Sequence, residues 1–536
     1  MSDKKLPTGH LTLLFASYLL LGFALLSLEV IWGRLTGLTL GSSIRAYSIT
    51  LAAVMAGLFF GTLHGSRISL RAEVGRLFAY MLAFTVFAGV ASVSFVYLSE
   101  TFKLWRFALD ISAKSAYYIT LLQVSLLVFL PSFFCGAVFP IATQILVPDV
   151  QHAGRTAGLL YMVNSMGAIA GSLLTGFVLI EYLGLKNSAI LLSLLPAVPA
   201  LLFFFVFRPA VQAAGAALLF AAVIAGGVLA AYPRFPFTVY LSHRYSTLEE
   251  VNRSSATYET LGEYENARGF VRVIESDDTR FLPVNFKNES SFMGLDLPPQ
   301  ALLALLPKVY LGRDPARLLD IGLGTGTTVW FARKWAREID SVEINPDVYD
   351  AVKTFFFPEF SDAANVNFRF EEARFFLSNN DRKYDIITVE PSYPTDSVTA
   401  SLYTREAFRL YREALTDDGV LSMFIPLHVL GVKYAEGVIK TALTEFGDVE
   451  IWSIGSGSDI VVVAAQKQFK KGPDEVVDRI SAIRINPLGN LGSALTYAKR
   501  NAKLEEIRQS PEVPLYTDDV ITLEVAAVNG FLSDHE

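Results

Sequence analysis

The chain contains few of the residues that build disulfides or metal centres. Among 536 residues there are one cysteine, Cys135, and six histidines. A single cysteine excludes a disulfide within the chain and a site with several thiolate ligands, and no pair of histidines has the spacing of a zinc site. We therefore expect an enzyme or binding protein that works without a metal.

Positive charge is also scarce. Lysine and arginine number 45 against 52 acidic residues, which gives a net charge of −7. Nucleic acid is therefore not the expected partner, because affinity for a phosphate backbone depends on clustered cations. Apolar residues make up 52% of the chain, and the mean hydropathy is +0.40. This average conceals two unlike halves.

Long apolar runs fill the first half and end at Tyr232. A helix that crosses a bilayer needs about 20 mainly apolar residues, and seven runs approach that length. They lie at about 11–31, 43–63, 77–98, 117–140, 157–180, 189–207 and 211–232. The first run follows Lys4 and Lys5 but lacks a clear cleavage site, so we expect an anchor and not a signal peptide. The sequence predicts a membrane domain of about seven helices over residues 1–232, with the lipid bilayer as a partner.

One short segment of the second half has the pattern of a nucleoside site. An apolar strand that includes Asp320 runs into Gly322-x-Gly324-x-Gly326, and the next strand, 341–344, carries Glu343. Glycines let the backbone approach a ligand, and the first turn of the following helix offers free N–H groups. An acid about 20 residues further on can accept hydrogen bonds from two ribose hydroxyls. A tight turn and a solvated strand end are the alternative explanations.

Strands and helices alternate around this segment. Residues 270–274 and 280–284 are expected to form a hairpin, and a helix at 299–309 precedes the glycine strand. Further strands are expected at 384–389, 420–426, 449–454 and 459–465, with a helix at 407–415. This alternation predicts an α/β doubly wound, mostly parallel sheet, with its ligands at the carboxyl ends of the strands. We divide this half into a linker and β-hairpin lobe, 233–298, and a Rossmann-like domain, 299–536.

Four motifs follow one another in a fixed order along this half. They are D-I-G-x-G-x-G from Asp320, V-E-I-x-P from Val342, E-A-R-x-F-L from Glu372 and Y-D-I-I-x-x-E-P-S from Tyr384. After a small N-terminal β-lobe, this order resembles the spermidine-synthase family of class I S-adenosylmethionine-dependent transferases. The first half resembles the major-facilitator-like helices to which that domain is fused in some proteins. Residues 131–140 and 164–172 are among those that carry this resemblance.

The resemblance implies a donor, an acceptor and their ligands. The donor would be decarboxylated S-adenosylmethionine or S-adenosylmethionine, and the acceptor an amine or polyamine. Donor-binding residues would be Asp320, Gly322, Gly324, Thr325, Gly326, Glu343, Glu372 and Ala373. Glu390 and Tyr393 occupy the catalytic strand-end positions, and Glu289 and Asp396 are expected on the acceptor side. Glu372 would contact the adenine amino group, although it could instead cap a helix.

Some of these positions depart from the family pattern. Thr325 stands where the family has an aspartate that holds the amino group of the cofactor. Glu390 and Tyr393 replace the two aspartates of the strand-end motif. Because the second of these aspartates binds the diamine, the exchange for tyrosine disfavours putrescine as the acceptor.

The expected chemistry needs little beyond positioning and one base. A sulfonium donor is already activated, so holding the acceptor in line lowers the barrier. An amine with a pKa near ~10 must first lose a proton, and the carboxylate of Glu390 can attract the ammonium and take that proton. The alternative is a membrane transporter or scaffold whose nucleoside domain only senses. Seven spans are too few for a twelve-helix transporter, although a homodimer could supply more.

The loops between the apolar runs do not set the orientation. Lysines and arginines are divided equally between the two sides, so the positive-inside rule gives no answer. A nucleoside cofactor made in the cytosol would place the second half there. We therefore expect a multi-pass protein of a cell membrane, the inner membrane in bacteria, with a cytoplasmic C-terminal domain.

Overall fold

The computed structural model divides the chain into two compact units, Met1–Leu248 and Glu249–Glu536. The described residues are 8–40, 44–68, 74–96, 105, 109, 111–146, 153–200, 202, 249, 258–276, 279–285, 287–292, 297–391, 394, 397–454, 459–485, 489–490, 495–497, 501–519 and 523. The expected span at 211–232 lies outside them, as do Tyr393 and Asp396. Each unit is considered by itself.

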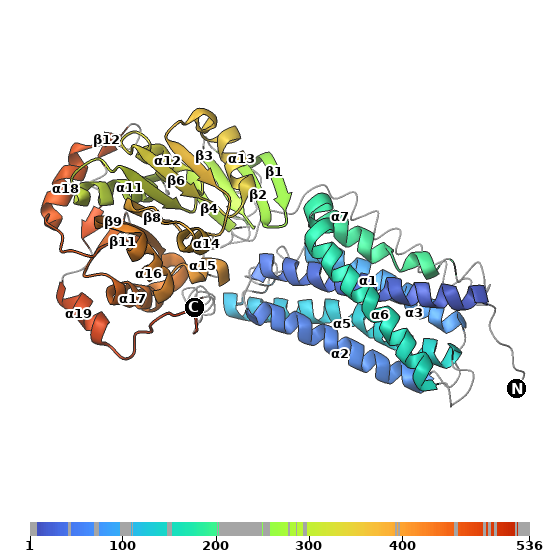
Figure 1. The fold of residues 1–536 in the computed structure, drawn as a ribbon. Helices are drawn as coiled ribbons and strands as arrows, with labels where there is room; N and C mark the ends of the chain where they lie inside the picture. Colours follow the sequence, from blue (N-terminus) through green and yellow to red (C-terminus); the bar gives the residue numbers. More distant parts are fainter. Residues whose placement is uncertain are drawn as a thin grey trace, which may run out of the picture. The chain divides into compact units, whose positions relative to one another are not determined.

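Long apolar helices build the N-terminal unit (Figure 1). They are α1 (Thr8–Leu40), α2 (Ile44–Ile68), α3 (Val74–Val96), α5 (Ala113–Leu146), α6 (Ala153–Leu174), the π-helical turn η3 (Thr175–Leu179) and α7 (Ile180–Leu194). Within the described residues, five helical stretches are long and apolar enough to cross a membrane: Leu11–Gly37, Ala46–Ile68, Gly75–Phe95, Lys114–Leu146 and Ala153–Ala200.

The last of these stretches corresponds to two of the expected spans. It covers 48 residues, but Gly184 inside α7 has φ 76° and ψ 169°, which is not helical. Glycine adopts a positive φ without steric cost, so the chain can turn there. The apolar run at 157–180 therefore ends before this break, and the run at 189–207 begins after it.

Glycine brings two pairs of helices in this unit into close contact. Three glycines at intervals of four residues on α2 face α5: Gly57, Gly61 and Gly65. A Cβ atom at Gly61 would lie 2.0 Å from the carbonyl oxygen of Phe133. On α6, a Cβ at Gly167 would lie 2.0 Å from the carbonyl oxygen of Leu19 on α1. Small residues at this spacing let apolar helices pack backbone to backbone, which dispersion forces then stabilise.

An eight-stranded sheet forms the centre of the C-terminal unit, in the order β14-β10-β11-β9-β8-β5-β6-β7. Its strands are β5 (Arg317–Ile321), β6 (Glu338–Val342), β7 (Val366–Arg369), β8 (Tyr384–Val389), β9 (Leu415–Pro426), β10 (Asp448–Ile454), β11 (Asp459–Ala465) and β14 (Leu495–Tyr497). β5 to β9 pair in parallel, whereas β10, β11 and β14 are antiparallel additions. The predicted doubly wound, mostly parallel sheet is confirmed.

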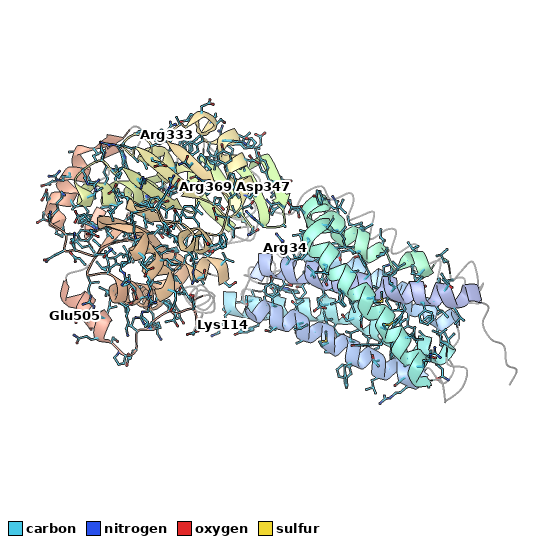
Figure 2. The ribbon with its side chains drawn as sticks, viewed as in Figure 1. Arg34, Lys114, Arg333, Asp347, Arg369 and Glu505 are labelled. Carbon is cyan, nitrogen blue, oxygen red and sulfur yellow. The ribbon has the colours of Figure 1, made fainter. Side chains whose placement is uncertain are left out.

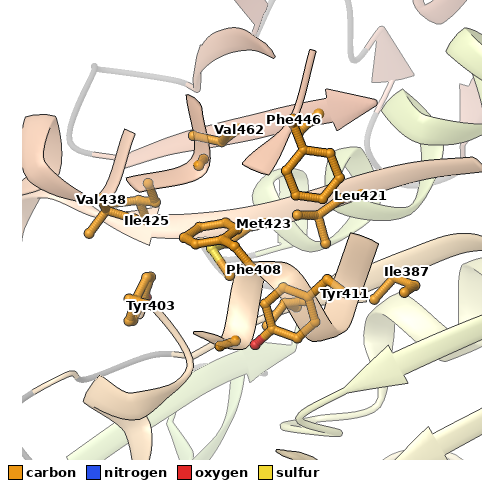
Figure 3. Packing of buried hydrophobic residues seen from close by; sticks show 14 of the residues in the cluster. Ile387, Tyr403, Phe408, Tyr411, Leu421, Met423, Ile425, Val438, Phe446 and Val462 are labelled. Atoms are coloured by element: carbon orange, nitrogen blue, oxygen red, sulfur yellow. The ribbon is translucent and has the colours of Figure 1, made fainter. Parts of the chain in front are cut away.

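Helices cover both faces of this sheet (Figure 1). They are α11 (Leu297–Leu311), α12 (Thr327–Ala332), α13 (Pro346–Phe355), α14 (Ala373–Ser378), α15 (Ser397–Ser401), α16 (Arg405–Ala414), α17 (Leu427–Glu445), α18 (Pro473–Ala482) and α19 (Asn501–Gln509), with the 3-10 turn η5 (Pro358–Asp362). Successive strand residues point to opposite faces. Accordingly Leu319 joins one buried core, whereas Leu318 joins a second. Phe408 and Met423 of the first core are shown in Figure 3.

A separate antiparallel sheet precedes the large one. It consists of β1 (Glu259–Asn266), β2 (Gly269–Ser276), β3 (Thr279–Val284) and β4 (Lys287–Phe292) in that order. Glu275 pairs with Arg280 across β2 and β3, so the hairpin predicted at these residues is confirmed. The short strands β12 (Arg484–Ile485) and β13 (Gly489–Asn490) form a third sheet.

Two expected boundaries differ from the structure. Helix α16 ends at Ala414 and β9 begins at Leu415, so Asp417–Gly419 lie within the strand instead of preceding it. Strand β6 ends at Val342, so Glu343 follows the strand instead of lying inside it. A register shift in the pairing of β8 with β9 accommodates the polar residues Asp417–Gly419 within the strand. No local pattern in the sequence indicates this shift.

The glycine contact between α2 and α5 leads to a stability test. Gly61→Ala would place a methyl group against the Phe133 carbonyl, and overpacking of this kind costs about 1–3 kcal/mol. Alanine gains at most about 1 kcal/mol over glycine in a helix, so we expect a lower melting temperature in detergent. Gly158→Ala on α6 is the control, because no atom lies within 4 Å of its added Cβ. Equal melting of the two variants would contradict the packing argument.

Candidate functional site

The glycine loop begins where β5 ends. Gly322, Gly324 and Gly326 have φ values of 88°, 53° and 80°, in the left-handed region that favours glycine. The N–H of Gly322 donates to the carbonyl of Val342 over 2.9 Å. A Cβ atom at Gly322 would lie 3.3 Å from the carbonyl oxygen of Glu390. The loop therefore passes tightly between the ends of β6 and β8.

Glu343 lies immediately after β6 and faces this loop. Its Oε2 accepts a hydrogen bond from the N–H of Leu323 (3.1 Å), and its Oε1 accepts one from the N–H of Asn345 (2.9 Å). Burial raises the pKa of the Glu343 carboxyl, whereas these backbone donors and the charge of Arg268 lower it. The half-buried side chain is thus fixed in direction at the expected ribose position.

Asp320 lies beneath Glu343 and is fully buried. It accepts hydrogen bonds from the hydroxyls of Ser341 and Thr388, both at 2.9 Å. Burial raises the pKa of Asp320 to about 7, the two hydroxyls lower it, and the nearby charge of Glu343 raises it. Asp320 therefore ties β5 to β6 and β8, and its expected contact with the donor stays a prediction.

Glu372 caps the helix that follows β7. Its oxygens accept hydrogen bonds from the N–H groups of Arg374 (3.0 Å) and Phe375 (2.7 Å), at the start of α14. The alternative weighed for this residue, a helix cap, is thus present in the structure. Ala373 is the first residue of that helix. A carboxylate oxygen can accept more than one hydrogen bond, so a contact of Glu372 with adenine stays a prediction.

Glu390 directly follows β8 and lies beside two helices. Gln300 of α11 donates from Nε2 to Oε1 of Glu390, and Thr328 of α12 donates from Oγ1 to Oε2, both at 3.3 Å. The N–H of Glu390 donates to the carbonyl of Ile321 over 3.1 Å. Each oxygen of the carboxylate thus has a donor from a different helix. This sets the direction of the side chain at the carboxyl end of the sheet.

Thr325 belongs to the same polar group. Its hydroxyl lies 3.5 Å from Oε1 of Gln300 and 2.9 Å from the hydroxyl of Thr327. Gln300, Thr325 and Thr328 are all at least 98% buried. A neutral threonine thus stands beside the glutamine that orients Glu390.

Sequence reasoning missed Gln300 and Thr328. Gln300 lies on an expected helix with an apolar sequence, and only the packing of α11 against α12 brings it to Glu390. The one available signal was a polar residue between Pro299 and a run of leucines. Of the acceptor-side candidates, Glu289 lies in β4, and only its backbone is described.

The C-terminal Asp518 forms a structural tie. Arg374 donates to both of its oxygens, and Thr404 donates from Oγ1 to Oδ1 over 2.8 Å. Burial raises the pKa of Asp518, but the hydrogen bonds from Arg374 and Thr404 outweigh this and lower it. This contact holds the segment after α19 against α14 and α16. Across the residues that the structure describes, no group of three histidine, cysteine or acidic side chains could hold a metal.

The raised pKa of Asp320 leads to a test of pH dependence. Because the folded protein holds this proton up to about pH 7 and the unfolded chain loses it near the ordinary 3.8, the stability from Asp320 is present at low pH and lost as the pH rises through about 7. Asp320→Asn removes this titration. We expect its melting temperature in detergent to fall less between about pH 5 and 7.5 than that of the unaltered protein.

The exposed Asp418→Asn serves as the control for this comparison. Asp418 pairs on the surface with Lys467, and its variant should keep the pH dependence of the unaltered protein over the same range. An undiminished fall in Asp320→Asn would show that Asp320 stays ionised in the folded protein.

Comparison with known proteins agrees with this geometry. Residues 301–441 match the family model described as the spermine/spermidine synthase domain. A polyamine aminopropyltransferase of Oceanobacillus iheyensis is 21% identical over 407 residues, which cover 73% of each chain. Another, of Nitrosomonas europaea, is 29% identical over 150 residues, 27% of this chain and 44% of that protein. The first match is longer than the whole C-terminal unit, so it continues into the N-terminal unit.

Solved spermidine synthases are also similar to this chain. The structure of one in complex with the transition-state analogue AdoDATO has a TM-score of 0.41 at 15% identity and covers 46% of this chain and 88% of its own. The enzyme from Thermotoga maritima has a TM-score of 0.40 at 15% identity and covers 46% and 87%. Residues 301–441 of the C-terminal unit are thus similar to the spermine/spermidine synthase domain, and the curated relatives that match the chain are polyamine aminopropyltransferases.

Proposed function

We propose that this chain is an integral-membrane transferase that moves an aminopropyl group from an adenosyl-sulfonium donor to an amine of the polyamine class. The observation that carries the proposal is the fixed carboxylate of Glu390, beside a glycine loop and the ribose-position acid Glu343. The matched family model and the names of both curated relatives support the reaction class.

The donor site is formed by the edge of the sheet between β5 and β6. The carboxylate of Glu343 accepts hydrogen bonds from the ribose diol, and the glycine loop leaves room for the sulfonium centre. The donor carries an activated carbon, so no metal is needed for the transfer. Decarboxylated S-adenosylmethionine delivers an aminopropyl group, whereas intact S-adenosylmethionine would deliver a methyl group.

Transfer is a single displacement. The amine nitrogen attacks the carbon next to the sulfonium, a C–N bond forms, and the C–S bond breaks with its electron pair going to sulfur. The products are a thioether, 5′-methylthioadenosine for aminopropyl transfer, and an alkylated amine. The ammonium form of the acceptor must lose a proton before attack, and Glu390 accepts it directly or through one water. Gln300 and Thr328 orient this carboxylate towards the acceptor.

We infer that the reaction takes place at a bilayer. The five helical stretches with the length and composition of membrane spans support this inference. We infer that these helices anchor the catalytic unit, and an acceptor can then reach it from the membrane.

Membrane anchoring is tested by fractionation. We expect the full chain to stay in the membranes after a carbonate wash and to be released by detergent alone.

The donor site is tested by Glu343→Ala. Charge-assisted hydrogen bonds are worth roughly 1.5–3 kcal/mol each, so we expect at least about tenfold weaker binding of 5′-methylthioadenosine by calorimetry. The control is Glu505→Ala on α19, an exposed carboxylate that bonds only within its own helix (Figure 2). Unchanged affinity in Glu343→Ala would remove this residue from the donor site.

The base is tested by Glu390→Gln. The amide keeps the shape of the side chain but cannot take a proton, so the rate of a single turnover should fall by about 10²–10⁴. Donor affinity should change little, because Glu343 and the glycine loop bind the donor. Asp418→Asn, a surface carboxylate paired with Lys467, is the control and should transfer normally.

The same assay identifies the reaction. Both S-adenosylmethionine and its decarboxylated form are offered with a panel of amines, and products are read by mass spectrometry. An aminopropylated amine supports the proposal, and putrescine should be a poor acceptor. Normal transfer by Glu390→Gln would show that another group removes the proton. Adenosyl-compound binding without any transfer would favour a sensing domain instead.

A further inference from the structure

The turn between β1 and β2 is fastened to the edge of the sheet where the donor's ribose is expected. Asn266, at the end of β1, donates from Nδ2 to Oδ1 of Asn345 (2.7 Å) and to Oδ2 of Asp347 (2.8 Å). Both partners lie at the start of α13, two and four residues after Glu343. The small β-lobe therefore reaches the nucleoside edge through this turn.

Arg268, at the tip of the turn, bridges two strands of the large sheet. Its Nη1 donates to the carbonyls of Ile344 and Phe370, the latter at 3.3 Å. These two residues directly follow Glu343 and Arg369, which are joined by an N–H···O bond of 2.9 Å. The guanidinium thus lies just beyond the carboxyl ends of β6 and β7, on the edge of the sheet at which an open α/β sheet binds its ligands.

The guanidinium keeps donors that no described residue uses. An arginine has five N–H donors, and within the described part of the chain only Nη1 of Arg268 has partners. The side chain is exposed, as are the apolar side chains of Ile344 and Phe370, each at 39%. A planar cation with spare donors beside a diol-binding carboxylate suits a flat base with ring-nitrogen acceptors, such as adenine.

We propose that Arg268 is a further nucleoside-contacting residue, which reaches over the adenosyl group from the β-lobe and donates to it through Nε and Nη2. The proposal rests on the adenosyl donor of the proposed function. It extends the site beyond the large sheet, because the cover of the nucleoside comes from the preceding small sheet. The rival explanation is that Arg268 only fastens the turn to the sheet.

The charge of Arg268 separates these two explanations. Burial raises the pKa of Glu343, and Arg268 is the cation that lowers it. Other charged side chains lie on the segments around Glu343. They are Asp320 at the end of β5, Asp347 at the start of α13, Arg369 at the end of β7, and Glu371 and Glu372 shortly after β7; Asp347 and Arg369 are labelled in Figure 2. Removal of the Arg268 charge should therefore raise the pKa of Glu343, whereas loosening the turn alone should not.

The experiment measures 5′-methylthioadenosine binding by the detergent-purified full chain between about pH 4.5 and 8. Arg268→Gln should weaken binding by roughly tenfold at neutral pH, because a charged donor is lost. Its affinity should also begin to fall at a higher pH on acidification, since Glu343 takes up its proton earlier. Arg268→Lys keeps the charge, so the acid limb, the fall in affinity on acidification, should stay at the pH of the unaltered protein. Its affinity at neutral pH should lie between those of the unaltered protein and Arg268→Gln. Asn266→Ala, the matched control, loosens the same turn without changing charge.

The outcomes are distinct. Weaker binding with a shifted acid limb in Arg268→Gln alone supports the proposal. Binding by Arg268→Gln equal to that of the unaltered protein overturns it and leaves the proposed function standing. Equal losses in Arg268→Gln and Asn266→Ala with no shift of the acid limb also overturn it, in favour of a fastening role. Failure of the unaltered protein to bind the thioether or S-adenosylmethionine would overturn the proposed function as well.

Discussion

The C-terminal unit depends on the close approach of three strand ends at Gly322. Its N–H donates to the carbonyl of Val342 at the end of β6, and a Cβ added to it would lie 3.3 Å from the carbonyl oxygen of Glu390 just after β8. The next residue, Leu323, donates to Glu343. A side chain at this point would meet the Glu390 backbone, and a positive φ of 88° would strain it further. Because the two carboxylates proposed for donor and acceptor stand on either side of this glycine, the loop sets the distance between the two halves of the site.

Buried charge is the second constraint. Asp320 and Glu343 are close enough to raise the pKa of Asp320, and two hydroxyls and two backbone N–H groups compensate only in part. Placing two carboxylates at one buried sheet edge is costly unless they are paired. Arg268 is the cation that offsets this charge at the surface. The arrangement explains why an exposed arginine on a distant hairpin is held against the backbone of this edge.

The sequence predicted what depends on local pattern and missed what depends on packing. Alternation of strands and helices was sufficient for the doubly wound sheet, and the glycine spacing was sufficient for the loop and Glu343. Gln300 and Arg268 carry no such signal, because their partners lie 90 and 76 residues away. Glu372 shows the limit of a motif: the structure shows the helix cap that was the alternative, and the contact with adenine stays a prediction. Apolar runs located the helices of the first unit and already separated 157–180 from 189–207, and the structure puts the break between them at Gly184.

Glycine serves two physically different purposes in the two units. In α2 and α6 it is helical and is needed for its missing side chain, which lets backbones touch where an apolar solvent offers little drive for association. At Gly322 and Gly326 it is needed for its backbone angles. The β1–β2 turn, which we propose covers the nucleoside, belongs to the same compact unit as the sheet. The groups proposed for donor binding and proton transfer, Glu343, Glu390 and Arg268, all belong to this one unit.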